Sequence, residues 1–404
     1  MKSYKKGIIV NNFISIVLIL FFFSCSNDEF KENTSDKTNI SEHQDTLVLS
    51  PDSILKLKQI LNADEKAKQF HKYFAHLHKA GIFNGNVLVA QHGITIYEES
   101  FGYSDLRKKT PLNSNSKFQI ASVSKQFTAV SIMQLYEKGL LDYNDSIQKY
   151  FPEFPYKGIT IHMLLTHTSG LPNYTYLCDR KFPYKDSAVY NNEVIKCMEK
   201  YQPAKYYTPG KRFDYSNTGY ILLASIVEKV SGMSFPEYLK KNIFEPLHMN
   251  NTFVYVKGKT NIPSNTTIGY KTYRRKAEDI FLNGVYGDKG IYTTTGDLLK
   301  WDQGLYKNII IKYKNLERAF KPWAHKRWTK KYYGYGWRIY NDKIAGKVIY
   351  HSGWWYGYQS LLIRLEKDKS TIIVLKNKKT MGLINHSKLF SILYSNEIEG
   401  QSTI

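Results

Sequence analysis

The sequence predicts an α+β fold in which one antiparallel sheet is built from both ends of the chain. Strand-like alternation is concentrated near residues 86–101 and again at 335–376, whereas the segment between them reads mostly as helices. A helical region inserted between the two halves of a sheet produces this distribution. The chain has 404 residues, of which 42% are hydrophobic and 15% aromatic, so it is long enough to bury a sizeable core.

The elements expected within this fold follow from hydrophobic periodicity and from residues that start and stop helices. Residues 63–80 have helical spacing and are followed by Gly81, so they predict the first long helix. A hairpin is expected over 86–101, where two β-rich stretches flank the turn at His92-Gly93. The remaining helices are expected at 122–138, 160–167, 218–230, 235–243, 297–304 and 383–396. The remaining strands are expected at 335–339, 348–352, 359–365 and 371–376.

Residues 1–25 have the features of a targeting signal. Three lysines precede the apolar run 13–23, which is too short for a comfortable transmembrane helix and ends at Ser24-Cys25. This pattern resembles a bacterial lipoprotein signal, in which Cys25 would be lipidated and become the first mature residue. A membrane anchor that is not cleaved is the alternative. Either way, we expect the protein in the cell envelope, anchored on the periplasmic or cell-surface side of a membrane.

The next segment, 26–50, is polar and poor in glycine, and it predicts a disordered tether. A helical pattern begins at Pro51, so one domain is expected over 51–404. Its helical insertion is expected at about 140–285.

The formal net charge of +22 raises the question of nucleic-acid binding. The lysines are scattered along the chain, however, and no nucleic-acid-binding motif accompanies them. We therefore expect a solvated basic surface, near anionic glycans or lipid head groups, and no nucleic-acid partner.

Histidines and cysteines outside the motifs carry weaker signals. His71, His76 and His78 are expected on the surface of a helix, because no cysteine or carboxylate stands at metal-ligand spacing from them. Cys178 and Cys197 could form a disulfide in an oxidising compartment, and the sequence leaves their pairing open.

Ser122 and Lys125 form a Ser-x-x-Lys motif at the start of an amphipathic helix. Residues three apart share one helical face, and the unpaired N–H groups of the first turn favour an oxyanion. A neutral lysine beside a serine hydroxyl can activate that hydroxyl as a nucleophile. Apolar residues follow downstream, so this helix is expected to be buried at the centre of the molecule. Taken alone, the motif also fits an ordinary polar helix start.

Two further motifs supply partners for this serine. Tyr215-x-Asn217 follows the turn at Pro209-Gly210 and precedes a helix, so its phenol and amide project from the same loop. The phenol of Tyr215 could exchange a proton with the serine, and Asn217 could hold both a lysine and a substrate amide. Each motif alone also fits an ordinary surface turn.

The third motif, His351-Ser352-Gly353, stands at the end of a predicted strand. Gly353 would let backbone approach a ligand closely. His351 and Ser352 could contact a substrate carboxylate, although a histidine at a strand end is commonplace.

In this order the three motifs resemble the serine β-lactamase and penicillin-binding-protein superfamily, and within it the class C β-lactamase-related branch that includes DD-peptidases. The resemblance covers about residue 65 to the carboxyl end. Further stretches that match this branch are 164–172, 215–220, 246–249 with 251–252, and 290–294 with 297–298.

The resemblance implies a role for each motif residue. Ser122 would be the acylated nucleophile, and Lys125 with Tyr215 would transfer protons, either of them acting as the base. Asn217 would orient substrate. The backbone N–H groups of Ser122 and Trp354 would form an oxyanion hole, and such a donor typically contributes roughly 3–4 kcal/mol to transition-state stabilisation.

Departures from the family pattern bear on the substrate. True class C lactamases carry lysine where His351 stands, so we expect weak or no β-lactamase activity. Trp354, Trp355 and Tyr356 occupy positions where small residues are common, and they would either line the site or pack into the core. Lys289 also replaces a small residue, and we expect it to place a positive charge near the pocket.

The resemblance thus implies a serine hydrolase that works through an acyl-enzyme, with a peptide ending in D-alanine or another D-amino-acid peptide as the expected substrate. An esterase or a weak β-lactamase of the same family is the first alternative. A catalytically inactive penicillin- or peptidoglycan-binding lipoprotein is the second. The sequence contains no His-x-His-x-Asp or His-Glu-x-x-His, so neither a metal nor another cofactor is expected.

Overall fold

The computed structural model describes residues 50–182, 185–271, 275–325, 327–380 and 384–395. The predicted signal peptide, its Cys25 and all but the last residue of the predicted tether lie outside these ranges. Within them, no helix has both the length and the apolar character that a membrane crossing requires.

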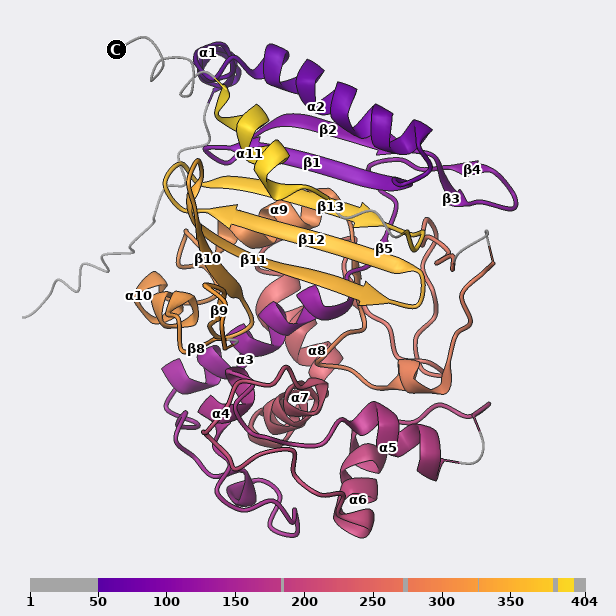
Figure 1. Cartoon of the computed structure of the whole chain (residues 1–404), viewed down its shortest axis with the longest axis vertical. Helices are drawn as coiled ribbons and strands as arrows, with labels where there is room; N and C mark the ends of the chain where they lie inside the picture. The colour runs from indigo at the N-terminus through magenta and orange to yellow at the C-terminus, as the bar shows by residue number, and fades with distance from the viewer. Residues whose placement is uncertain (1–49, 183–184, 272–274, 326, 381–383, 396–404) are drawn as a thin grey trace, which may run out of the picture. The chain divides into compact units, whose positions relative to one another are not determined.

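An eight-stranded antiparallel sheet joins the two ends of the domain (Figure 1). The strand order is β2-β1-β13-β12-β11-β10-β9-β8, and β1 pairs with β13 so that Val87 lies opposite Val374. The strands are β1 (Gly85–Gln91), β2 (Ile94–Phe101), β8 (Ala324–His325), β9 (Tyr332–Tyr333), β10 (Arg338–Asp342), β11 (Gly346–Trp355), β12 (Tyr358–Leu365) and β13 (Ser370–Lys376). The predicted α+β fold with a sheet built from both ends is confirmed.

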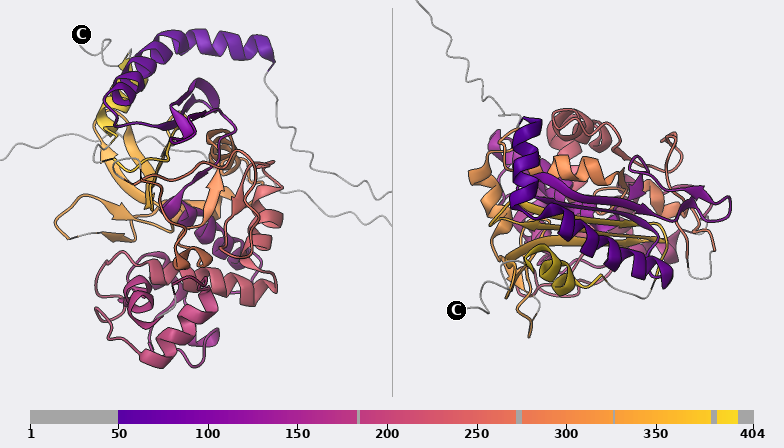
Figure 2. Two further views of the ribbon diagram at one scale, coloured as in Figure 1. Left: turned by 90° about the vertical axis from the view of Figure 1, so that its right-hand side faces the viewer. Right: turned by 90° about the horizontal axis from the view of Figure 1, so that it is seen from above.

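Helices cover both faces of this sheet (Figure 1 and Figure 2). The helices are α1 (Pro51–Ile60), α2 (Ala63–Lys79), α3 (Ser124–Glu137), α4 (Ile161–Leu165), α5 (Tyr174–Lys181), α6 (Asn191–Tyr201), α7 (Asn217–Ser231), α8 (Phe235–Leu239), α9 (Thr295–Gly304), α10 (Tyr313–Leu316) and α11 (His386–Leu393). On one face, Val87 and Val89 of β1 pack with α2 and α11. On the other face, Leu88 and Ala90 of the same strand join the larger core around α3 and α9. Because successive side chains of a strand point to opposite faces, β1 is buried on both sides.

Helix α3 runs through the larger core. Every residue from Ser124 to Leu135 is buried, and the ring of Phe127 stacks on Trp301 of α9 with centroids 3.9 Å apart. A helix that is buried all round must pair its polar side chains, and Gln126 accepts a hydrogen bond from the Trp301 indole at 3.1 Å. The predicted central helix is therefore present, although Ser122 itself lies in the 3₁₀ turn Ala121–Val123 that leads into it.

Between β5 (Phe118–Gln119) and β8 the chain forms α3 to α10 and contributes no strand to the large sheet. Its short strands β6 (Phe253–Val254) and β7 (Ile291–Thr293) pair with β5 instead. Helices α5 and α6 were not predicted, and they bury Cys178 and Cys197, which are both free thiols.

The strand expected at 335–339 begins later, at Arg338. Its start is displaced because Gly334 and Gly336 pass close to other backbone groups. A Cβ at Gly336 would lie 2.9 Å from the carbonyl oxygen of Lys125, and Gly336 has a positive φ of 87°. This close approach places the β9–β10 segment against the start of α3.

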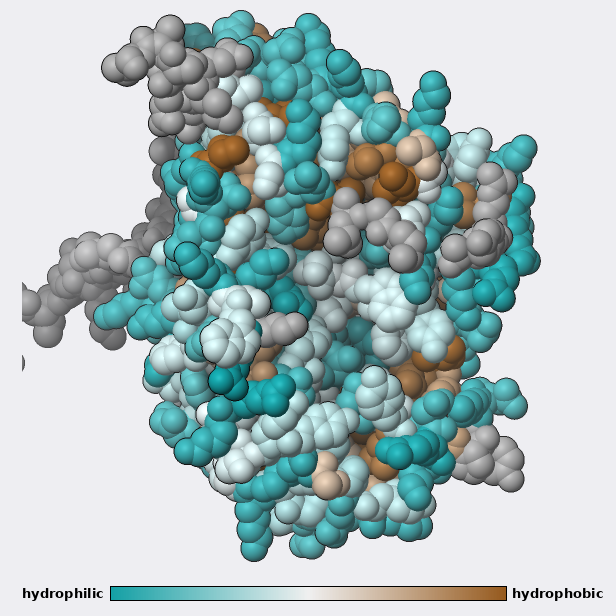
Figure 3. All heavy atoms as spheres, viewed as in Figure 1, coloured by the Kyte–Doolittle hydropathy of each residue, from teal (hydrophilic) through white to brown (hydrophobic). Residues whose placement is uncertain are grey.

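The surface is mostly hydrophilic on the face shown in Figure 3, as expected for a strongly basic chain. Among the described residues, the most exposed large apolar side chain is Trp328, which is 89% exposed.

Candidate active site

Ser122 and Lys125 lie within hydrogen-bonding distance of each other. Lys125 Nζ lies 3.1 Å from Ser122 Oγ, 2.9 Å from Asn217 Oδ1 and 2.8 Å from the backbone oxygen of Asp288. These three acceptors match the three N–H donors of a protonated amine. The lysine side chain is fully buried, so its amine is held in one orientation beside the serine. The first and second sequence motifs therefore meet in space.

The backbone before the serine is unusual. Ala121 has a positive φ of 46°, a conformation that costs a residue with a side chain of order 1–3 kcal/mol. Ala121 is 1% exposed, so surrounding packing holds it there. The left-handed turn presents Ser122, which is half-buried, at the wall of a large pocket.

Strand β11 approaches this turn closely at Gly353. A Cβ at Gly353 would lie 2.3 Å from the backbone oxygen of Ile120 and 3.0 Å from Ala121 Cβ. Only a residue without a side chain allows this approach, so the glycine of the third motif has a packing reason. The contact brings the backbone of Gly353 and Trp354 beside that of Ser122, and the oxyanion-hole assignment of the Ser122 and Trp354 N–H groups stays a prediction.

Tyr215 lies beside this serine–lysine pair. Lys125 Nζ is 5.0 Å from the centroid of its ring, and its hydroxyl has no hydrogen-bond partner in the described part of the chain. The ring packs on His167 with centroids 4.3 Å apart. A buried phenol without a partner is available to exchange a proton with a bound substrate or with Ser122.

His167 fixes the loop that carries Tyr215. Its Nδ1 accepts a hydrogen bond from the backbone N–H of Ser216 at 3.0 Å, and its backbone oxygen accepts from Asp214 N–H at 2.8 Å. Burial, together with the nearby positive charge of Lys125, lowers the pKa of His167 well below its usual value. A neutral ring with Nδ1 as acceptor is therefore part of the packing of this site. In the sequence, His167 is noted only as one residue of the stretch 164–172, which matches the family pattern.

Asn217, the first residue of α7, and Asp288, which follows Gly287, both accept hydrogen bonds from Lys125. The neighbouring Lys289 is fully buried and donates to Tyr174 Oη at 2.8 Å and to Asp288 Oδ1 at 3.3 Å. Burial lowers the pKa of Lys289, while the Asp288 carboxylate opposes that shift. The structure thus places Lys289 inside the protein in a pair with Asp288, whose backbone oxygen accepts a hydrogen bond from Lys125.

His351 also differs from its expected place. The side chain is fully buried, and its Nδ1 donates to the backbone oxygen of Ser352 at 2.8 Å while Nε2 lies 3.0 Å from the hydroxyl of Tyr333. Burial, with the positive charges of Arg338 and Lys125, lowers its pKa well below its usual value. A substrate carboxylate cannot touch this ring. Strand alternation explains the difference, because Ser352, the next residue of β11, points into the pocket.

The pocket that contains Ser122 has a volume of about 720 Å³. Its wall includes Ser122, Tyr215, Asn217, Ser352, Gly353 and Trp354. Trp354 is 51% exposed, and Trp355 lines both this pocket and a second cavity. Tyr356 lines only the second cavity of these two.

Arg338 of β10 is a wall residue that the sequence did not single out. Its guanidinium carbon lies 5.1 Å from the centroid of the Tyr215 ring, and its Nε is buried without a hydrogen-bond partner in the described part of the chain. In the sequence, a single arginine within Trp337-Arg338-Ile339 reads as the solvent-facing position of a strand. Only the pairing of β10 with β11, with Arg338 opposite Tyr350, shows that this position faces the pocket.

The described residues contain no cluster of three or more histidine, cysteine or acidic side chains arranged to hold a metal ion. The chemical groups assembled around Ser122 include its hydroxyl, the amine of Lys125, the phenol of Tyr215, the amide of Asn217 and the guanidinium of Arg338.

Comparisons with known proteins agree with this arrangement. Residues 68–387 match the family model described as Beta-lactamase. Penicillin-binding protein 4* of Bacillus subtilis is 37% identical over 327 residues, which are 78% of this chain and 72% of that protein. A penicillin binding protein from Bacillus halodurans has a similar structure, with a TM-score of 0.69 and 25% identity over 81% of this chain and 98% of that chain.

The D-amino acid amidase of Ochrobactrum anthropi shares the fold, with a TM-score of 0.68 and 21% identity over 84% of this chain and 99% of that chain. The matched region contains all three motifs. The chain therefore belongs to the beta-lactamase family, and it is a serine hydrolase of the β-lactamase and penicillin-binding-protein superfamily.

Proposed function

We propose that this serine hydrolase is an envelope-anchored carboxypeptidase that removes a terminal D-amino acid, with peptides ending in D-Ala-D-Ala as the leading substrate. The observation that carries the proposal is the position of Arg338, because a fixed cation in the pocket of the serine suits a substrate with a free carboxylate.

In the proposed reaction, Ser122 Oγ attacks the carbonyl carbon of the scissile peptide bond. Its proton passes to the Lys125–Tyr215 pair, and the backbone N–H groups of Ser122 and Trp354 stabilise the oxyanion. The C–N bond then breaks, the pair protonates the departing amine, and the acyl group remains on Ser122. A water molecule attacks this ester and gives a proton to the same pair. The bond between the acyl carbon and Ser122 Oγ then breaks, the pair returns the proton to Ser122 Oγ, and the acid product leaves.

Arg338 supports recognition of the leaving residue. A guanidinium offers up to five N–H donors and binds a carboxylate through two parallel hydrogen bonds. Arg338 lies against Tyr215, which belongs to the proton-transfer pair, so a carboxylate bound there would lie next to the group that protonates the departing amine. His351 is neutral and buried, so it does not supply this charge.

The test compares diacetyl-Lys-D-Ala-D-Ala with the same peptide ending in a carboxamide. We expect the wild type to prefer the free carboxylate by at least about tenfold in kcat/KM, and Arg338→Met to remove most of that preference. Arg327→Met, which removes an exposed arginine of the neighbouring β8–β9 hairpin, is the matched control. Equal hydrolysis of both peptides by the wild type would reject a carboxypeptidase.

An esterase is the second candidate, favoured by the apolar side chains in the lining of the same pocket, which include Leu361, Val374 and Ile384. Hydrolysis of a p-nitrophenyl ester that needs Ser122, without release of D-alanine from either peptide, would support it. Neither peptide nor ester hydrolysis would favour the binding lipoprotein.

The envelope location rests on the predicted signal and on Cys25. Metabolic labelling with a fatty-acid analogue should label the wild type, and Cys25→Ser should remove the label and release the protein from membranes. Labelling of the serine variant at the wild-type level would reject Cys25 as the lipid site.

A further inference from the structure

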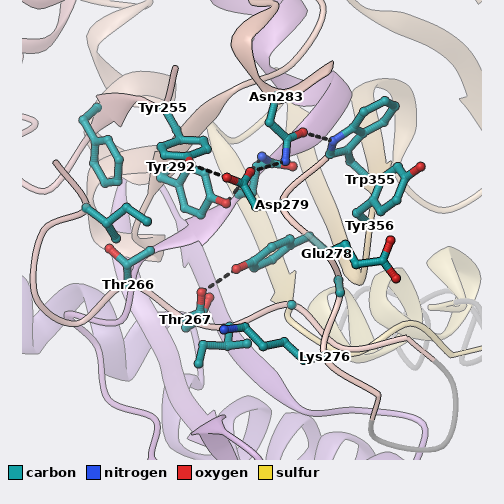
Figure 4. Close-up of a pocket in the computed structure, with 17 residues that line it drawn as sticks. Tyr255, Thr266, Thr267, Lys276, Glu278, Asp279, Asn283, Tyr292, Trp355 and Tyr356 are labelled. Atoms are coloured by element: carbon teal, nitrogen blue, oxygen red, sulfur yellow. Dashed lines mark hydrogen bonds between the residues drawn. The ribbon is translucent and has the colours of Figure 1, made fainter. Parts of the chain in front are cut away.

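A second cavity lies beside the catalytic pocket, and the two share the side chain of Trp355. Its volume is about 200 Å³. Figure 4 shows Tyr255 and Tyr292 on one side of it, Trp355 and Tyr356 on the other, and Asp279 between them. The aromatic side chains that line it are Phe253, Tyr255, Tyr292, Trp355, Tyr356 and Tyr358.

Several hydrogen-bond donors of this lining already have partners within the protein. Tyr255 Oη donates to Asp279 Oδ2 at 2.8 Å, and Asn283 Nδ2 donates to Asp279 Oδ1 at 2.7 Å. The Trp355 indole donates to Asn283 Oδ1 at 2.8 Å, and Tyr358 donates to a backbone carbonyl. These four donors are therefore engaged inside the lining and are not available to a ligand.

The cavity lining also contains hydrogen-bond acceptors that remain available to a ligand. Gln119 is 3% exposed, and its Oε1 has no hydrogen-bond partner in the part of the chain that the structure describes. Asp279 is exposed, and its carboxylate takes part in none of the ion pairs found among the described residues, although Lys257 Nζ donates to its backbone oxygen. At the rim, Lys271 and Glu278 neutralise each other at 3.2 Å. A ligand for this cavity must bring donors and suits a positive charge.

We propose that this cavity is an accessory site for an organic ammonium group on a short alkyl chain. The aromatic rings offer the faces that attract a desolvated ammonium, and Asp279 with Gln119 offers hydrogen-bond acceptors for its N–H groups. The volume suits a chain of a few carbon atoms. Because Trp355 is shared, an occupied site is next to the acylation pocket. The ammonium belongs either to the acyl part of the substrate or to a separate small molecule.

The test measures n-butylammonium binding by titration calorimetry to the full chain carrying Ser122→Ala, so that the result does not depend on catalysis. We expect n-butanol, which has the same chain without the charge, to bind at least about tenfold more weakly. Asp279→Asn should weaken n-butylammonium binding by about tenfold as well. Glu245→Gln, which alters an exposed acid at a distant surface position, should leave the affinity unchanged.

Equal affinity for the two probes, or an unchanged affinity in Asp279→Asn, would overturn the proposal. The exposed Lys276 also lines the cavity and could place its own ammonium there. Binding that appears only in Lys276→Met would show that the cavity accommodates the protein's own lysine, which also overturns the proposal.

A second experiment distinguishes an ammonium on the acyl part of the substrate from an ammonium on a separate small molecule. A D-Ala-D-Ala peptide with a free lysine side chain is compared with its Nε-acetyl form in the catalytically intact protein. A lower KM for the free amine, lost in Asp279→Asn, assigns the site to the substrate. Equal KM values, with n-butylammonium binding retained, assign it to a separate molecule. Failure of both peptides to react would count against the proposed carboxypeptidase alone.

Discussion

The hydroxyl of Tyr333 lies 3.0 Å from Nε2 of His351, and both rings are buried next to Tyr215. Nδ1 of His351 donates to a backbone carbonyl, so Nε2 is the acceptor of a neutral imidazole. The histidine of the third motif is thus a packed, uncharged part of the site, whereas Arg338, Lys331 and Lys376 line the pocket.

The neutral state of His351 predicts a dependence of stability on pH. Its pKa is well below the ordinary 6.5 in the folded protein, so below that pH the unfolded chain binds more protons. The free energy of unfolding should therefore fall as the pH decreases through about 6.5. Between pH 7.5 and 5.5, His351→Gln should lose about 1.4 kcal/mol less than the wild type, measured by urea unfolding.

His167 has the same sign of pKa shift and should contribute a similar term. His76→Gln removes an exposed histidine and should leave the pH dependence as in the wild type. A wild type whose stability does not change between these pH values would contradict the neutral, buried state of both rings.

Ser122→Ala should reduce turnover by at least about 10³-fold while the melting temperature stays close to that of the wild type. Intact mass spectrometry after incubation with a penicillin should show an adduct on the wild type only. Since His351 is neutral, nitrocefin turnover should be slow. Turnover by Ser122→Ala at the wild-type rate would remove the acyl-enzyme mechanism altogether.

Gly353→Ala should impair both catalysis and stability, because its methyl group would lie 2.3 Å from the backbone oxygen of Ile120. Strand β11 would have to move away from Ser122, which displaces the N–H of Trp354. We expect kcat to fall at least about tenfold and stability to fall by about 1–3 kcal/mol. The control is Gly296→Ala in α9, where a Cβ meets nothing within 4 Å. If the two variants show the same kcat and the same stability, the close approach at Gly353 is not important for catalysis.

A buried ion pair holds the sheet to α9. Arg364 Nη1 lies 3.1 Å from Asp302 Oδ1, both residues are at most 2% exposed, and burial raises the pKa of Asp302. Arg364→Met leaves a buried carboxylate without its cation and should destabilise the protein by about 3–5 kcal/mol, measured by urea unfolding. Adding Asp302→Asn should recover part of this loss.

The ion pair between the exposed Lys347 and the half-buried Glu366, whose nitrogen and oxygen lie 3.0 Å apart, provides the comparison. Lys347→Met should cost at most about 1 kcal/mol, because water screens exposed ion pairs. Equal losses for Lys347→Met and Arg364→Met would contradict the importance of burial at Asp302.

Features that depend on neighbouring residues were predictable from the sequence. The alternation of β1, β12 and β13 and the periodicity of α2 and α7 lie in short windows, and their strands and helices formed within a few residues of the predicted bounds. Ser122 and Lys125 are three residues apart, so the geometry of one helical turn already places them side by side. The order of the three motifs also indicated the family, which the comparisons confirmed.

The tertiary structure alone decided which side chains face the pocket. Arg338 faces it, whereas His351 turns away from it, although the sequence suggested that His351 contacts a substrate carboxylate. Lys289, expected near the pocket, is enclosed with Asp288. Gln119 and Asp279 are 160 residues apart and line one cavity. The physical reason is that the local sequence fixes the period of a strand or helix, whereas the elements packed against it fix which of its faces is buried and which meets a ligand.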